Sequence, residues 1–216
     1  MATEVSAFRW VPPFAQGYVR DLRVRWALEE AGLPYHATLI ASQVQPSECY
    51  RQWQPFGQVP AYRDSEVEMF ESGAIVLYIA AKSEKLAPRD EPGRARMTSW
   101  VIAALNSIEP HAQNLIQFDG SGAGETWAGE YGARLRAMLD RRLAALSAWL
   151  GRKEYLEGCF SAGDLMMTTV LRELVDSGVL SQFPILDAFR QRCEARPAFG
   201  RAMEAQMQPF RENAPT

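Results

Sequence analysis

Two dipeptides carry residue types that suit the binding of a small peptide. Glu71-Ser72 precedes an apolar run with helical spacing, and Ser72 is a favourable N-cap residue. Its N–H and hydroxyl would lie where the helix dipole is positive, which favours a carboxylate. The Glu71 carboxylate beside it can accept from an ammonium group. An α-carboxylate and an α-ammonium on one carbon would need such a mixed pair, whereas the alternative role of Ser72 is only to cap the helix.

Val59-Pro60, at the start of an extended run, is the second of these dipeptides. Only about 5–6% of X-Pro bonds are cis in folded proteins, so an ordinary proline at a strand edge is the alternative. A cis bond would turn the N–H and C=O of Val59 outward at the edge of a sheet. Those groups could then pair antiparallel with the backbone of a bound peptide, as in strand addition.

The elements that must position these dipeptides follow the order β-α-β-α-β-β-α. The pattern predicts strands over 5–11, 35–40, 59–63 and 67–70, and helices over about 20–30, 46–53 and 72–81. The first two strands are joined through a helix, so they should be parallel. The last two form an antiparallel hairpin with a polar tip at 64–66. We therefore expect an α/β domain with a mixed four-stranded sheet.

The second half of the chain is helical in period throughout. A charged stretch with two prolines, KSEKLAPRDEPG, precedes it and indicates a linker. The first helical run is expected to end near Pro110, with a loop at 119–125 before the next helix. The predicted domains are residues 1–83 and 94–216, joined by a linker at 84–93, and the second domain is an all-α bundle.

Composition excludes several classes of function. The 216 residues are 47% hydrophobic and 23% charged, which is typical of a soluble globular protein. A net charge of −3 gives no reason to expect nucleic acid or an anionic membrane as a partner. The chain has no apolar run of membrane-spanning length and no signal-peptide pattern at its N-terminus. Three cysteines without a CxxC fit a reducing cytoplasm, and two histidines argue against a multi-histidine metal site.

Together these motifs resemble the soluble, cytosolic-type bacterial glutathione S-transferases over nearly the whole chain. The resemblance rests on the segments WALEEAGLPYHATL, GQVP, ESGAIVLYIA, LAP and FSAGDLMMTTVL. The last segment would be a capping-box helix, in which Ser161 caps and Asp164 reaches back. The resemblance implies a thioredoxin-like N-terminal domain that binds glutathione, and an all-α C-terminal domain that forms most of the pocket for an electrophile. It also implies a cytoplasmic homodimer.

Carried over by position, the resemblance gives roles to the two dipeptides. Val59 would pair with the cysteinyl backbone of glutathione before a cis-Pro60, and Glu71 and Ser72 would hold the γ-glutamyl end. Two glutamines, one before the short helix and one beside Val59, would add polar contacts. The implied glutathione-binding residues are Gln45, Gln58, Val59, Pro60, Glu71 and Ser72.

The family activates the glutathione thiol with a Tyr, Ser or Cys near the start of the first helix. The thiolate is the nucleophile, and a thiol with a pKa near 8.5 is mostly protonated at neutral pH. No Ser or Cys lies between Ser6 and Gly32, and Tyr18 falls at the family's serine position. Tyr18 could donate to the sulfur, or Arg20 could stabilise the thiolate by charge. The alternatives are a pocket-lining aromatic and a surface ion pair.

The resemblance also suggests which residues border the electrophile pocket, namely Trp10, Phe14, Asn106, His111 and Leu115. The predicted activity is the attack of glutathione thiolate on a small apolar electrophile, without a metal, in detoxification. The alternatives are a non-catalytic glutathione-binding or protein-interaction module, and a glutathione-dependent isomerase or disulfide reductase. The missing Ser or Cys favours the module, and the two dipeptides oppose a loss of glutathione binding.

Overall fold

The computed structural model describes residues 2–41, 44, 47–121 and 128–215. The chain divides into two compact units, of which the first contains Met1–Ala87 and Ala195–Thr216 and the second contains Pro88–Glu194. This division differs from the predicted domains at the C-terminal end. We expected the last residues to belong to the helical domain, whereas the final helix packs along the first helix of the first unit.

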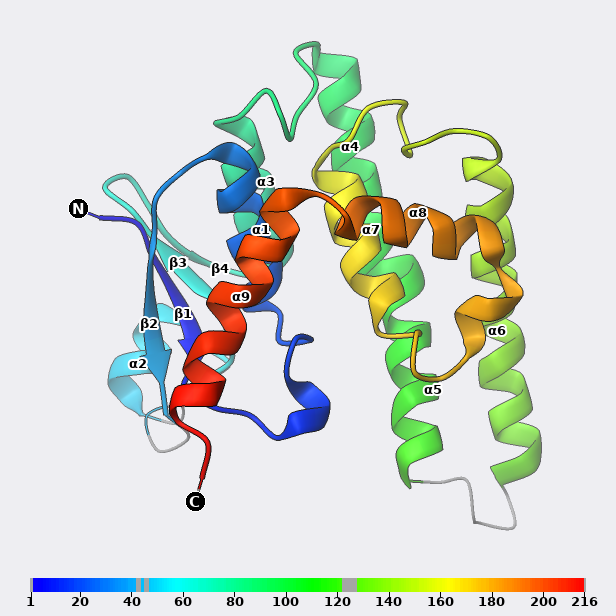
Figure 1. Cartoon of the computed structure of the whole chain (residues 1–216), viewed down its shortest axis with the longest axis horizontal. Helices are drawn as coiled ribbons and strands as arrows, with labels where there is room; N and C mark the ends of the chain where they lie inside the picture. Colours follow the sequence, from blue (N-terminus) through cyan, green and yellow to red (C-terminus); the bar gives the residue numbers. More distant parts are fainter. Residues whose placement is uncertain (1, 42–43, 45–46, 122–127, 216) are drawn as a thin grey trace. The chain divides into compact units, whose positions relative to one another are not determined.

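A four-stranded sheet with the order β2-β1-β3-β4 forms the centre of the first unit (Figure 1). The strands are β1 (Glu4–Phe8), β2 (His36–Ile40), β3 (Ala61–Arg63) and β4 (Glu68–Phe70). Strand β1 is parallel to β2 and antiparallel to β3, which pairs antiparallel with β4. The mixed sheet, its parallel first pair and its terminal hairpin are therefore confirmed.

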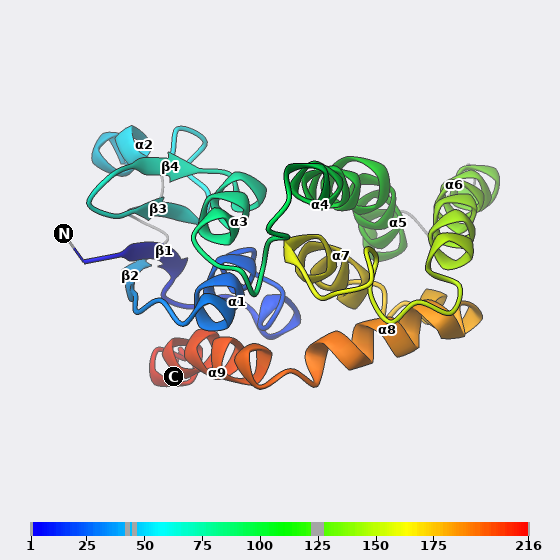
Figure 2. The same cartoon turned by 90° about the horizontal axis from the view of Figure 1, so that it is seen from above.

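Helices cover both faces of this sheet, with α1 and α3 on one face and α2 on the other (Figure 2). The helical elements of the first unit are η1 (Pro13–Ala15), α1 (Asp21–Ala31), α2 (Glu48–Trp53), α3 (Ser72–Ala81) and α9 (Pro197–Glu212). Nearly all of α1 is buried, because α3 and α9 both pack against it. The core of this unit includes Val5, Trp26, Leu28, Ala61, Tyr62, Ile75 and Ile79.

Helix α9 is held to α1 by ion pairs and an aromatic contact. Arg196 donates two hydrogen bonds to the carboxylate of Glu30, at 2.6 and 2.8 Å. The rings of Trp26 and Phe199 meet edge to face with their centroids 4.9 Å apart. Bidentate arginine–carboxylate pairs and such aromatic contacts stabilise helix packing. These contacts join residues about 170 positions apart, which the linear pattern of the sequence did not reveal.

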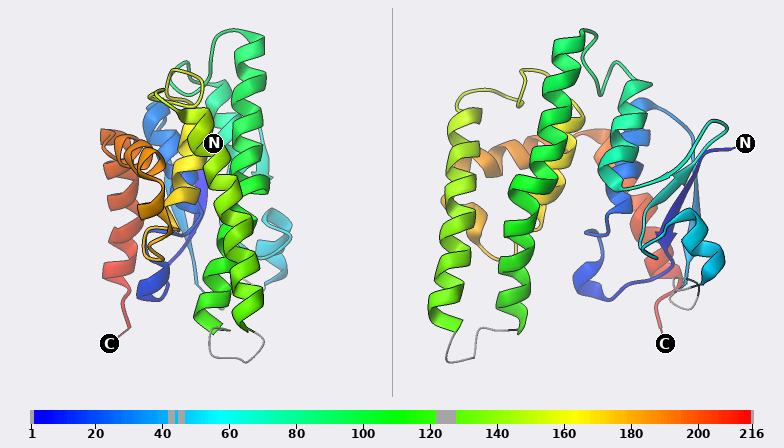
Figure 3. Two further views of the ribbon diagram at one scale, coloured as in Figure 1. Left: turned by 90° about the vertical axis from the view of Figure 1, so that its right-hand side faces the viewer. Right: turned by 180° about the vertical axis from the view of Figure 1, so that it is seen from behind.

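The second unit consists of helices only (Figure 3). Its elements are α4 (Glu91–Ala103), the π-helical segment η2 (Ala104–Ile108), α5 (Glu109–Ser121), α6 (Ala128–Leu150), α7 (Ala162–Arg172), η3 (Val179–Gln182) and α8 (Pro184–Glu194). The core includes Val101, Ala104, Leu139, Leu143, Met166 and Val170. None of the described helices in either unit is both long enough and apolar enough to cross a lipid bilayer.

The first long helix of this unit does not end near Pro110, so that prediction was wrong. Segments α4, η2 and α5 form one continuous rod that reaches Ser121 (Figure 3). The π-helical turn changes the hydrogen-bond register immediately before α5, and Pro110 is the second residue of α5. Pro110 has no backbone N–H to donate, and it directly follows the π-helical turn, where the regular hydrogen-bond register is already interrupted. Of the predicted loop, residues 122–127 lie outside the described residues.

The predicted capping box at the start of α7 is confirmed. The Ser161 hydroxyl accepts from the Gly163 N–H at 3.3 Å, and the Asp164 carboxylate accepts from the Ser161 N–H at 2.9 Å. Asp164 also accepts from the Leu156 N–H at 2.8 Å, which ties the preceding loop to the helix. Burial raises the pKa of Asp164 to about 6, although these hydrogen bonds act in the opposite direction.

Candidate functional site

The register of the β3–β4 hairpin places the two dipeptides at the same end of the sheet. Ala61 lies opposite Phe70 in this antiparallel pair. Pro60 immediately precedes Ala61, and Glu71 immediately follows Phe70. Val59-Pro60 and Glu71-Ser72 therefore leave the hairpin side by side, where β3 begins and β4 ends.

The peptide bond between Val59 and Pro60 is cis. Neither the N–H nor the C=O of Val59 forms a hydrogen bond with any residue in the described part of the chain. Buried backbone groups in folded proteins are almost always paired, so this residue is an exception that needs a partner. Antiparallel pairing with a bound peptide would supply that partner.

A chain of three hydrogen bonds fixes the backbone on both sides of Val59-Pro60. The Ala61 N–H donates to Ser6 Oγ at 2.7 Å, and Ser6 Oγ lies 2.8 Å from Tyr50 Oη. Tyr50 donates its hydroxyl hydrogen to the carbonyl of Gln58 at 2.6 Å, so the Ser6 hydroxyl must donate to Tyr50. Both side chains are buried, and burial raises the pKa of Tyr50.

Ser6 and Tyr50 were not identified by sequence reasoning. Ser6 lies in β1 between the buried residues Val5 and Ala7. A single hydroxyl between apolar neighbours in a buried strand is the signal that could have found it, because such a group needs an internal partner.

Of the two glutamines predicted to bind glutathione, Gln58 lies in the described part of the chain and Gln45 does not. Gln58 has an exposed side chain. Its backbone is held at both ends, because its N–H donates to the buried Gln54 side chain at 3.2 Å and its C=O accepts from Tyr50. Gln45 lies outside the described residues. Contacts of either glutamine with a ligand remain predictions.

Ser72 is not the N-cap of α3, so the predicted cap was wrong. Helix α3 begins at Ser72, and Glu71 occupies the N-cap position without a side-chain capping bond. The N–H groups in the first turn of α3 therefore have no capping side chain as an acceptor. They make a suitable anion site. The Ser72 side chain, 5% exposed, is instead contacted by Arg23 of α1, whose Nη1 lies 3.3 Å from Ser72 Oγ.

Glu71 has an unusual backbone conformation, with φ 70° and ψ 111°. It is the one residue other than glycine with positive φ in the described part of the chain. Such a conformation costs about 1–3 kcal/mol and is concentrated at functional sites. Glu71 is exposed and immediately precedes the first residue of α3. Its role toward a ligand remains a prediction.

The predicted catalytic residues lie at the start of α1. Tyr18 is half-buried, and its N–H donates to the Ala15 carbonyl at 3.1 Å. Arg20 is exposed at the N-cap position of α1 and makes no side-chain capping bond. Both residues belong to the same unit as Val59 and Ser72. Their roles toward a thiol remain predictions.

Gln206 of helix α9 binds both residues that flank Arg20. The Gln206 side chain donates to the Val19 carbonyl at 3.0 Å and to the buried Asp21 carboxylate at 2.7 Å. Asp21 also accepts from Arg25 Nε at 2.7 Å, within α1. Burial raises the pKa of Asp21, although the Arg25 charge acts in the opposite direction. This network was missed because the Gln206–Asp21 contact spans 185 positions.

The residues predicted to border an electrophile pocket are divided between the two units. In the first unit, Trp10 is half-buried and Phe14 is 83% exposed in η1. In the second unit, Asn106 is exposed in η2, while His111 is half-buried and Leu115 is buried in α5. Burial lowers the pKa of His111, and the charge of Arg142 adds to this. The pocket that these residues would form remains a prediction.

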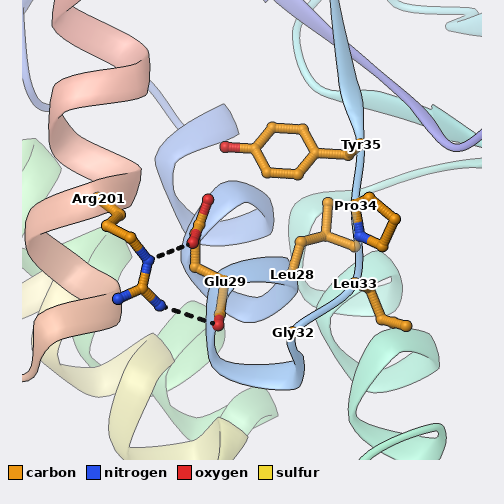
Figure 4. A pocket seen from close by; sticks show the side chains of 7 residues that line it. All are labelled: Leu28, Glu29, Gly32, Leu33, Pro34, Tyr35 and Arg201. Atoms are coloured by element: carbon orange, nitrogen blue, oxygen red, sulfur yellow. Dashed lines mark hydrogen bonds and ion pairs between the residues drawn. The ribbon is translucent and has the colours of Figure 1, made fainter.

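A separate surface pocket of about 390 Å³ lies at the C-terminal end of α1 (Figure 4). It is lined by Leu28, Glu29, Gly32, Leu33, Pro34, Tyr35 and Arg201, none of which belongs to the predicted site. Arg201 of α9 donates to the Glu29 carboxylate at 2.7 Å, so the charges in this pocket serve helix packing. Among the residues that the structure describes, no three His, Cys, Asp or Glu side chains cluster so as to hold a metal ion.

Comparisons with known proteins agree on one family. Residues 15–81 match the model of the glutathione S-transferase N-terminal domain. Glutathione S-transferase F11 of Arabidopsis thaliana is 30% identical over 175 residues, which cover 75% of this chain and 80% of that protein. A glutathione S-transferase of Hyoscyamus muticus is 28% identical over 200 residues, which cover 85% of this chain and 92% of the relative.

A solved structure supports the same assignment. A glutathione transferase of Burkholderia graminis, with two glutathione molecules bound per subunit, superposes with a TM-score of 0.81. The two chains are 25% identical, and the match covers 94% of this chain and 88% of the other.

Proposed function

This chain belongs to the glutathione S-transferase family, and we propose that it joins the sulfur of glutathione to a small apolar electrophile. The observation that carries this proposal is the pairing of Ala61 with Phe70, which sets the unpaired backbone of Val59 beside Glu71 and Ser72. One end of the site then offers backbone pairing, and the other offers a carboxylate beside a helix N-terminus.

Glutathione is complementary to this arrangement. Its cysteinyl N–H and C=O would pair with the C=O and N–H of Val59. Its γ-glutamyl carboxylate would accept from the first-turn N–H groups and the hydroxyl of Ser72, and its ammonium would donate to Glu71. The bound thiol would then lie toward the start of α1, near Tyr18 and Arg20.

The chemical step is a nucleophilic attack by the thiolate. The S–H bond of glutathione breaks and its proton passes to solvent. The sulfur lone pair then forms a C–S bond while the electrophile's leaving group, or its double bond, takes up the displaced electron pair. Tyr18 would stabilise the thiolate by donating its hydroxyl hydrogen, and Arg20 is the alternative through its charge. Glutathione is the only co-substrate in this scheme, which uses no metal.

The finer features rest on family membership. We propose that the chain works as a cytoplasmic homodimer in detoxification, with glutathione and a small apolar electrophile as its ligands and with neither nucleic acid nor membrane as a partner. The relatives reported above are named glutathione S-transferases. That favours conjugation over a non-catalytic module, an isomerase or a disulfide reductase.

Calorimetric titration with glutathione, followed by a conjugation assay with an aryl halide, tests this proposal. We expect Ser72→Ala to weaken binding about tenfold or more, because a hydrogen bond to a charged group is worth about 1.5–3 kcal/mol. Ser99→Ala, at an exposed serine of α4, is the matched control and should bind as the wild type does. No binding by the wild type would contradict the proposed site, and binding without conjugation would leave a glutathione-binding module.

A further inference from the structure

We infer that Arg23 is a positioning residue that fixes the Ser72 hydroxyl as a hydrogen-bond donor and so makes this end of the site selective for a carboxylate. The inference rests on the proposed function. Arg23 of α1 would set the direction of one hydrogen bond at Ser72. It would thereby help to select the ligand without touching glutathione itself.

The contact between the two side chains is buried. Arg23 is 2% exposed, and its Nη1 lies 3.3 Å from the Oγ of Ser72. Arg23 is the third residue of α1, and Ser72 is the first residue of α3. Helices α1 and α3 pack side by side on one face of the sheet (Figure 2). The Arg23 guanidinium therefore reaches the N-terminus of α3 from within the protein.

The chemistry of the guanidinium decides the direction of this hydrogen bond. Arginine has five N–H donors and no acceptor, so its guanidinium can only donate in this contact. Ser72 Oγ must therefore accept from Arg23, and the hydroxyl hydrogen of Ser72 points elsewhere. Among the residues that the structure describes, this hydroxyl donates to no other group. It is left to donate to a ligand.

The groups that would meet the ligand carboxylate are then all donors, whereas Glu71 would meet the ligand ammonium. The hydroxyl of Ser72 and the first-turn N–H groups of α3 would all point at the same ligand atoms, and the Arg23 charge lies behind them. A carboxylate can accept from all of these donors, whereas an amide N–H, an alcohol hydrogen or a methyl group cannot. Selection is strong when buried polar groups would otherwise lose their partners.

Lysine is a poor replacement for Arg23. Its ammonium is a compact and strongly hydrated point charge on a flexible stem, whereas the guanidinium is a planar fork that holds a fixed direction. Arg23→Lys therefore keeps the charge and loses the geometry. This variant separates orientation of the Ser72 hydroxyl from simple electrostatic attraction.

The test compares two ligands on the full chain by calorimetry. One ligand is glutathione, and the other is γ-aminobutyryl-cysteinyl-glycine, which lacks only the α-carboxylate of the γ-glutamyl group. We expect the wild type to prefer glutathione by about tenfold to a hundredfold, the value of one or two charge-assisted hydrogen bonds. In Arg23→Met and Arg23→Lys the preference for glutathione over the analogue should fall to about threefold or less. The affinity of each variant for the analogue should stay within about twofold of the wild-type value. The control is Arg201→Met, which removes another arginine of this unit.

If Arg23 has only a structural role, its substitution will lower the affinity for both ligands equally and leave the preference for glutathione unchanged. That result would overturn the inference. Glutathione binding by the wild type would still support the proposed function. If Arg23→Met does not fold, Arg23→Lys alone decides. A wild type that binds glutathione and the analogue equally would also overturn the inference. A wild type that binds neither ligand would overturn the proposed function and the inference with it.

Discussion

The hydroxyl of Tyr50 donates a 2.6 Å hydrogen bond to the carbonyl of Gln58, one residue before Val59. Tyr50→Phe removes this donor and leaves the Ser6 hydroxyl without its acceptor. A buried polar group that loses its partner costs about 1–3 kcal/mol, so we expect the free energy of unfolding to fall by that amount. Glutathione affinity should fall as well, because the backbone around Val59 is no longer held. Urea denaturation and calorimetry measure the two effects.

Tyr131→Phe is the matched control for this change, because Tyr131 of α6 is half exposed. It should leave both stability and glutathione affinity within error of the wild type. If Tyr50→Phe behaved in the same way, the hydrogen-bond chain would have no role in holding the site.

The strained backbone of Glu71 predicts opposite effects on stability and binding. Glycine adopts a positive φ without steric cost, so Glu71→Gly should raise the free energy of unfolding by up to about 1 kcal/mol. The same change removes the carboxylate proposed to hold the ligand ammonium, so glutathione affinity should fall. Thermal unfolding and calorimetry on one sample give both values.

Glu71→Ala separates the two causes. It removes the carboxylate but keeps a Cβ at φ 70°, so affinity should fall without a gain in stability. Full glutathione affinity in both variants would show that Glu71 does not hold the ligand.

Local features of this fold could be predicted from the sequence because their causes lie within a few residues. The hairpin follows from two extended runs with a polar tip, and the capping box from Ser161 and Asp164 three positions apart. The alternation of strands and helices gave the parallel pairing of β1 and β2.

The remaining features depend on contacts between distant positions. Ser6 meets Tyr50 and Ala61 across 44 and 55 residues, and Arg23 meets Ser72 across 49. The cap at Ser72 was wrongly predicted from the local preference of serine for N-cap positions. That preference carries no information about the contact between Ser72 and Arg23 of another helix. In the same way, the pattern of α9 predicts a helix, but its place beside α1 depends on contacts such as that between Arg196 and Glu30.

Gln206 links α9 to the start of α1, and its removal should be costly. Gln206→Ala takes a donor from both the Val19 carbonyl and the buried Asp21 carboxylate. We expect a loss of about 1–3 kcal/mol in the free energy of unfolding. Gln208→Ala, at an exposed position two residues further along α9, is the control and should change stability by less than about 0.5 kcal/mol. Equal effects of the two substitutions would contradict the assigned role of Gln206.

Asp164 should make stability depend on pH in an unusual direction. Its pKa is about 6 in the folded chain and near 3.8 in the unfolded chain, so the folded state binds the extra proton between these values. The free energy of unfolding should therefore fall as pH rises from 4 to 6, by roughly 3 kcal/mol at most from this group. Asparagine does not titrate, so the Asp164→Asn variant lacks this pH dependence. The difference in the free energy of unfolding between wild type and Asp164→Asn should therefore shrink as pH rises from 4 to 6. A gap that widens with pH would contradict the raised pKa.

The central claim is that this chain binds glutathione with its thiol activated, and the ultraviolet absorbance of the thiolate tests it most directly. A pH titration of the complex should give a pKa for the bound thiol at least about one unit below the free value near 8.5. Tyr18→Phe should return it toward 8.5 if the Tyr18 hydroxyl stabilises the sulfur, and Arg20→Ala should do so if the Arg20 charge is responsible. A bound thiol with an unshifted pKa in the wild type would contradict the claim.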